Sequence, residues 1–87
     1  MSTAELIRTR LAALEPETFT LEDESAQHRG HAGAAGGGGH FRLTIVSPKF
    51  RNLSTLARHR LVYETMGELM QREIHALSIS ALTPEEL

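Results

Sequence analysis

The amino-acid sequence predicts a small α+β domain whose elements follow the order α-β-β-α-β, with the start of a further α-helix at the end. Apolar residues recur at three- and four-residue steps in two segments, which indicates helices, and they alternate with polar residues in three others, which indicates strands. The length of 87 residues suits a single domain with one layer of core contacts. Together these observations predict a three-stranded mixed sheet.

The first predicted element is a helix near the N-terminus. Ser2 and Glu5 have the spacing of a capping box, in which the serine accepts from a free amide and the glutamate reaches back. Pro16 cannot continue a helix and sets its end. The apolar stripe between them consists of Leu6, Ile7, Leu11 and Leu14.

Two strands are predicted next, separated by a glycine-rich segment. Phe19 and Leu21 alternate with polar residues, and the alternation returns over residues 41–46. Residues 26–39 contain six of the seven glycines, so few side chains there can pack, and we expect a flexible loop. Consecutive strands joined only by a loop are expected to pair antiparallel.

The stretch from Leu53 to Leu77 has the clearest pattern. Ser54 is expected to cap a helix whose apolar stripe consists of Val62, Met66, Leu69 and Met70. The period then changes to two, which places His75 on the same strand face as Leu77 and Ile79. A helical crossover between the second and third strands should leave them parallel. The chain closes on a cap residue, a first-turn proline and an N3 glutamate, at Thr83, Pro84 and Glu86.

Composition limits the chemistry that the chain can perform. It has no cysteine, so it cannot form a disulfide, use thiol chemistry or supply a thiolate to a metal. The net charge of −2 contrasts with the large positive excess of strong nucleic-acid binders. No apolar run approaches the roughly 18 residues of a membrane span, and the N-terminus lacks a secretory signal. We therefore expect a cytoplasmic protein without a membrane partner.

The predicted topology brings histidines from separate segments to one end of the sheet. His28 and His31 follow the first strand, His40 opens the second, and His75 opens the third. Imidazole binds zinc, copper and iron well, so one interpretation is a metal or cluster site that uses His75 and a loop histidine. The alternative is that these histidines are solvated, and spacing alone favours that alternative.

The remaining polar residues suggest less. His59 shares a helix face with Val62 and Met66, which favours a core histidine over a metal ligand. No Ser/His/Asp order or carboxylate pair indicates catalysis, so we expect no enzymatic activity. A basic stretch could contact phosphates or a partner's carboxylates, although a solvated helix start is more common. Its members are Lys49, Arg51, Arg58 and Arg60.

Several short motifs follow one another along almost the whole chain. They are Asp23-Glu24-Ser25 followed by His28; His40-Phe41; Ser47 with Phe50; Arg58-His59-Arg60-Leu61-Val62-Tyr63; His75-Ala76-Leu77; and Thr83-Pro84-Glu85-Glu86. In this order and spacing they resemble the BolA family. The resemblance implies a single BolA-like domain over residues 1–87, with the α-β-β-α-β-α fold of the type II KH-like kind.

The resemblance also implies a function. BolA-like proteins pair with monothiol glutaredoxins, and the pair holds a bridged [2Fe-2S] cluster to which the glutaredoxin and its glutathione supply sulfur ligands. The BolA partner supplies a histidine or cysteine from the loop between the first two strands, plus the histidine before Ala-Leu. Carried over to this sequence, those ligands are His28 and His75, with His31 as a rival because this loop is long and glycine-rich. We therefore expect a non-enzymatic adaptor in iron–sulfur trafficking or iron sensing, with no cluster bound to the isolated chain.

A second role is implied by the family's history as DNA-binding transcriptional regulators. The KH-like fold and the basic stretch from Lys49 to Arg60 favour that role, whereas the net charge of −2 opposes it. The chain also lacks a clear Gly-x-x-Gly loop between helices, with which KH domains grip nucleic acid. DNA binding is therefore the alternative function, and we expect the isolated chain to be a monomer or a weak homodimer.

Overall fold

The computed structural model describes residues 2–24, 39–72 and 74–87, and it confirms the predicted α+β fold. The helices and strands are α1 (Thr3–Leu11), β1 (Thr18–Asp23), β2 (Gly39–Val46), α2 (Thr55–Met66), α3 (Leu69–Arg72) and β3 (Ile74–Leu82), and the 3-10 turns are η1 (Ala12–Leu14), η4 (Pro48–Phe50) and η5 (Pro84–Glu86). The strands form one sheet in the order β1-β2-β3. As predicted, β1 is antiparallel to β2, and β3 is parallel to β2.

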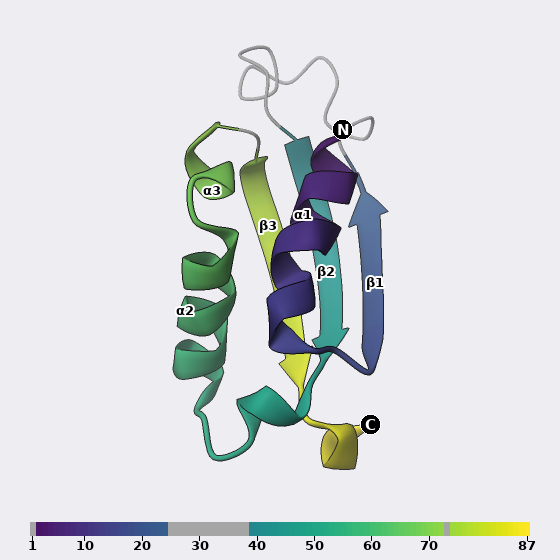
Figure 1. Ribbon diagram of the computed structural model, residues 1–87, viewed down its shortest axis with the longest axis vertical. Helices are drawn as coiled ribbons and strands as arrows, with labels where there is room; N and C mark the ends of the chain where they lie inside the picture. Colours follow the sequence, from purple (N-terminus) through teal and green to yellow (C-terminus); the bar gives the residue numbers. More distant parts are fainter. Residues whose placement is uncertain (1, 25–38, 73) are drawn as a thin grey trace.

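The apolar stripes of the helices and the inward residues of β2 form one buried cluster. Figure 1 shows α1 crossing in front of the sheet, with α2 beside β3. The members of the cluster with no exposed surface are Ile7, Leu11, Leu43, Ile45, Phe50, Val62 and Met66. Strand alternation places the intervening residues on the other face of the sheet, where Arg42, Ser78 and Ser80 are exposed.

The helix ends form where the sequence predicts them. The Ser2 hydroxyl accepts a hydrogen bond from the amide of Glu5 at 3.1 Å, and the Ser54 hydroxyl accepts one from the amide of Ala57 at 3.1 Å. Each such cap satisfies an amide that has no partner inside its helix. None of the described helices has the length and apolar character needed to cross a membrane.

The predicted central helix is in fact two helices. α2 ends at Met66, and Gly67 follows with a φ of 59°, a left-handed conformation that glycine adopts without a steric cost. The amide of Gly67 donates to the carbonyl oxygen of Tyr63 at 3.0 Å and closes the helix. Leu69 in α3 is nevertheless buried and Met70 is partly buried, so the apolar stripe continues toward the core across the break.

The loop predicted over residues 26–39 falls outside the described residues, except for Gly39. That residue belongs to β2, where it pairs with Ile74, so the predicted loop boundary is one residue too long. A side chain at Gly39 would collide with the ring of Phe41, which is almost fully buried. The close approach of this ring explains why the first residue of β2 is a glycine.

The ladder between β2 and β3 is irregular where β3 begins. Gly39 pairs with Ile74 and His40 pairs with Ala76, so His75 is an extra residue, as in a β-bulge. The prediction that His75 lies on the same strand face as Leu77 and Ile79 is therefore wrong. Its neighbours Leu77 and Ile79 pack against the core, whereas His75 is exposed. One inserted residue reverses the alternation on its far side, and a two-residue period cannot reveal it.

Ser47 joins three elements at the other end of the sheet. Its side chain is fully buried, and its hydroxyl donates to the carbonyl oxygen of Leu14 at 2.6 Å while accepting from the amide of Lys49 at 3.1 Å. Its own amide donates to the carbonyl oxygen of Leu82 at 2.9 Å. The Ser47 hydroxyl thus provides hydrogen-bond partners for a carbonyl oxygen and an amide. A buried polar group without a partner would lower the stability of the fold. Ser47 thus connects η1, β2 and β3.

Candidate metal-binding site

The described residues that flank the glycine-rich segment lie at the end of the sheet where β3 begins (Figure 1). The amide of Glu24 donates to the carbonyl oxygen of His40 at 2.7 Å, which continues the pairing of the first two strands. On the other side of β2, His40 lies opposite Ala76. We call Glu24, His40 and His75 the histidine rim. The predicted convergence of His40 and His75 at one end of the sheet is confirmed.

The two imidazoles of the histidine rim are in contact. The ring centroids of His40 and His75 are 4.9 Å apart, and the ring planes are inclined by 41°. His40 is half-buried and His75 is exposed. The bulge at the start of β3 explains the pair, because the extra residue allows the His75 ring to lie beside a residue of β2 that alternation turns away from the core.

A cavity of about 260 Å³ lies beside His40. Its lining combines three polar and three apolar residues, and consists of Glu24, His40, Phe41, Ala76, Leu77 and Ser78. The carboxylate of Glu24 is 3.4 Å from Nε of Arg42, which is itself exposed. The rim therefore offers two nitrogen donors with a partly neutralised carboxylate nearby.

Only one of the predicted cluster ligands is placed by the structure. His75 lies on the histidine rim, whereas His28 and His31 lie outside the described residues. Within residues 2–24, 39–72 and 74–87, no group of three or more histidine and acidic side chains could hold a metal ion. The fifth histidine, His59, is partly buried and belongs to α2, not to the strands that carry the rim.

The basic stretch lies at the opposite end of the sheet, and most of it is paired with acidic residues. Three of its four members form ion pairs: Lys49 with Glu15, Arg51 with Glu85, and Arg58 with Glu86. Arg60 is exposed on α2. The sequence interpretation of this stretch overlooked the acids because they lie far away along the chain. These pairs remove much of the positive potential that a phosphate backbone would require.

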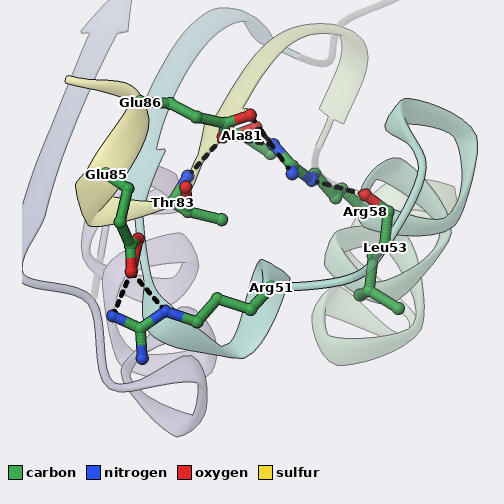
Figure 2. A network of polar contacts seen from close by, with 7 residues as sticks. All are labelled: Arg51, Leu53, Arg58, Ala81, Thr83, Glu85 and Glu86. Carbon is green, nitrogen blue, oxygen red and sulfur yellow. Dashed lines mark hydrogen bonds and ion pairs between the residues drawn. The ribbon is translucent and has the colours of Figure 1, made fainter.

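Arg58 is the central residue of this network (Figure 2). Its side chain is only 13% exposed. Nε donates to the carbonyl oxygen of Leu53 at 2.9 Å, and Nη1 donates to the carbonyl oxygen of Ala81 at 3.1 Å and to Oε1 of Glu86 at 2.6 Å. The guanidinium thus connects the start of α2, the end of β3 and η5, a use that its planar set of donors suits. We call these contacts the Arg58 lock.

The acids of the network have lowered pKa values. The hydrogen bond from Arg58, supported by one from the amide of Thr83, lowers the pKa of Glu86 from 4.5 to about 2. The hydrogen bond from Arg51 likewise lowers the pKa of Glu85. The amide of Thr83 donates to Oε1 of Glu86 at 2.7 Å, which is one half of the predicted C-terminal capping box.

These pKa shifts predict how stability depends on acid. A carboxylate whose folded pKa lies below its unfolded pKa binds fewer protons in the folded state, so its contribution is complete above the unfolded value and is lost as the pH falls. For Glu86 that loss should run from about pH 4.5 down to about pH 2. Glu86→Gln should therefore show a smaller fall in melting temperature over this range than the wild type, measured by circular dichroism. Glu64→Gln, an exposed change on α2, should follow the wild type, and equal curves for Glu86→Gln would contradict the prediction.

The role of His40 is the feature that sequence reasoning missed. Its place at the start of the second strand was predicted, but its contact with His75 depends on the bulge. The available signal was the pair of histidines that open two neighbouring strands, together with a glycine directly before the first of them. That signal predicts that His40 and His75 are close together. That their side chains lie on the same side of the sheet follows only from the pairing of β2 with β3.

Comparisons with known proteins agree with this architecture. The family described as BolA-like protein matches residues 11–86. BolA-like protein 1 of Mus musculus is 46% identical over 81 residues, which cover 92% of this chain and 57% of the mouse protein, so the chain spans a little over half the length of that relative. The DNA-binding transcriptional regulator BolA of Haemophilus influenzae is 32% identical over 87 residues, covering 99% of this chain and 82% of that protein. The solved BolA domain of SufE1 from Arabidopsis thaliana superposes with a TM-score of 0.87 at 41% identity, over 100% of this chain and 98% of that one.

Proposed function

The chain belongs to the BolA-like protein family, and we propose that it is a non-enzymatic adaptor that binds a monothiol glutaredoxin and co-ligates a [2Fe-2S] cluster. The observation that carries the proposal is the exposed imidazole of His75 at the end of the sheet from which the glycine-rich segment departs. An exposed ligand on a strand is accessible to a second protein, and the backbone on either side of His75 is held by the pairing of Ile74 and Ala76 with β2.

The donor atoms of this chain suit such a shared cluster. A [2Fe-2S] cluster takes four protein or cofactor ligands, and imidazole nitrogen can replace thiolate at two of them, as in Rieske centres. The chain has histidines and no cysteine, so its own ligands would be nitrogen atoms and the sulfur ligands would come from glutaredoxin and its glutathione. His75 would be one ligand and a loop histidine the other, with His28 favoured and His31 as its rival.

The alternative function, DNA binding, has weaker support. It rests on the name of the Haemophilus influenzae relative and on the basic stretch. Lys49, Arg51 and Arg58 are occupied by ion pairs, and Arg58 is mostly buried. A DNA surface built from them would have to break these ion pairs, and Arg58 would have to leave the carbonyl oxygens of Leu53 and Ala81. We therefore give preference to the cluster adaptor.

The adaptor is tested by mixing the apo chain with glutaredoxin that carries its cluster and recording visible absorption and circular dichroism. The wild type should change the spectrum, because imidazole nitrogens replace ligands of the glutaredoxin-bound cluster. A mixture with His75→Ala should give the same spectrum as cluster-loaded glutaredoxin without the chain. His28→Ala and His31→Ala, compared with each other, identify the loop ligand by which of them abolishes the change.

His59→Ala is the matched control, because it removes an imidazole from α2 rather than from the rim. It should give the wild-type spectrum. Far-UV circular dichroism should be the same for all variants, since His75 is exposed and its truncation opens no cavity in the core. An unchanged spectrum with the wild-type chain, or a wild-type change with His75→Ala, would show that the proposal is wrong.

A further inference from the structure

The imidazole pair of the histidine rim has a geometry that suits a single metal ion. With metal–nitrogen bonds of about 2.0–2.1 Å, two imidazoles on adjacent positions of one ion have centroids roughly 4.5–5 Å apart. The observed separation between His40 and His75 is 4.9 Å, and the inclination of 41° excludes a parallel stack. Binding of one ion by the pair requires that one nitrogen of each ring be directed at a common point.

The backbone around the pair is fixed on both sides. His40 lies within β2, the central strand, which is paired with β1 on one edge and with β3 on the other. His75 is held by flanking residues on both sides, since Ile74 pairs with Gly39 and Ala76 pairs with His40. Ligands on paired strands lose little conformational freedom when a metal binds, which favours binding by only two side chains.

Room and charge beside His40 also suit a hydrated cation. The cavity of about 260 Å³ beside His40 is large enough for an ion with several water molecules. The Glu24 carboxylate lines the same cavity and contributes negative charge, although its ion pair with Arg42 reduces it. Water or an external anion would complete the coordination sphere, because the rim supplies two nitrogen donors.

We propose that His40 and His75 form a binding site for one divalent transition-metal ion in the isolated chain. Imidazole sites bind Cu²⁺ more tightly than Ni²⁺ or Zn²⁺, so we expect Cu²⁺ to have the highest affinity for this site. This site uses no residue of the glycine-rich loop and needs no glutaredoxin. The test of this site is therefore independent of the test of the cluster adaptor, and either proposal can fail without the other.

The test is a titration of the untagged full chain with Ni²⁺ alone, followed by calorimetry and by the paramagnetic broadening of amide NMR signals. We expect one ion per chain, with broadening centred on residues 40 and 75–78. His40→Phe and His75→Phe keep a ring in place but remove its nitrogens, and each should weaken binding at least about tenfold, since even outer-shell changes cost ~10–100-fold in metal affinity.

Two controls separate this site from other histidines. The double variant His28→Ala/His31→Ala should bind Ni²⁺ with the wild-type affinity, and so should His59→Ala. Amide NMR spectra of the metal-free variants identify any change in fold. If a variant does not fold, the residues whose signals Ni²⁺ broadens in the wild type show whether the ion binds at His40 and His75. Wild-type affinity in His40→Phe, loss of binding in the loop double variant, or broadening centred away from β2 and β3 would overturn the proposal.

Discussion

Arg58→Met is expected to lower the free energy of unfolding by about 3 kcal/mol. The change removes the donors of the Arg58 lock, and the carbonyl oxygens of Leu53 and Ala81 each lose a hydrogen bond from a charged group, worth about 1.5–3 kcal/mol. A domain of this length has a total stability of roughly 4–13 kcal/mol, so the loss is a large fraction of it. Urea denaturation followed by circular dichroism measures the change.

Two variants sharpen this result. Arg58→Lys should lose most of the same free energy, because a single ammonium cannot reach two carbonyl oxygens and a carboxylate in the positions that the guanidinium spans. Arg60→Met, two residues along the same helix at an exposed position, should change stability by less than about 0.5 kcal/mol. A loss at Arg60 equal to that at Arg58 would contradict the structural role of the lock.

The Arg58 result also bears on DNA binding. A loss of DNA affinity in an Arg58 variant would follow from a weakened fold and would give no information about a phosphate contact. Arg60 is exposed, so its substitution tests the alternative function without that confusion. If DNA binding were real, Arg60→Met should weaken it and reduce its dependence on salt concentration.

Phe50→Ala is the second large expected effect, with a loss of about 3–5 kcal/mol in the free energy of unfolding. Phe50 is the largest side chain with no exposed surface, and it lies in η4 between β2 and α2. Phe50 belongs to the buried cluster that the helices and the sheet share, so removal of its ring leaves a cavity in that cluster. Thermal unfolding and urea denaturation of the wild type and the variant measure the loss.

Phe19→Ala is the matched control for Phe50→Ala. Phe19 on β1 is only partly buried, and the guanidinium of Arg8 lies 4.7 Å from its ring centroid. Truncation there removes less buried area and leaves a site open to water, so the loss should be less than half of that at Phe50. Equal losses for the two variants would show that Phe50 does not hold η4 to the core.

These expectations divide the family motifs into two groups. Ser47, Phe50, Arg58 and Glu86 hold the fold through burial and hydrogen bonds. His75, by contrast, is exposed and makes no comparable contribution to the core. A residue whose side chain is accessible at a strand end is therefore a better candidate for a ligand than one that the fold already uses.

The predictions that held depend on short stretches of chain. Ser54 caps α2 because its hydroxyl serves an amide three residues away, and the alternation around Leu43 indicates a strand because one face of the sheet is buried. Predictions that failed depend on a single residue that breaks a period. Gly67 interrupts the central helix, and the bulge at His75 interrupts the alternation of β3. The hydrophobic periodicity is a property of a whole segment, so it does not show which single residue interrupts a helix or a strand.

By itself, the sequence determined the order of the elements, the directions of the three strands and the end of the sheet where His40 and His75 meet. Local periodicity and chain connectivity suffice for these features. Only the tertiary structure decided that the two imidazoles touch and that Arg58 is locked to Ala81 and Glu86. Those contacts join residues more than 20 positions apart, and they depend on strand register and burial, which arise only when the chain has folded.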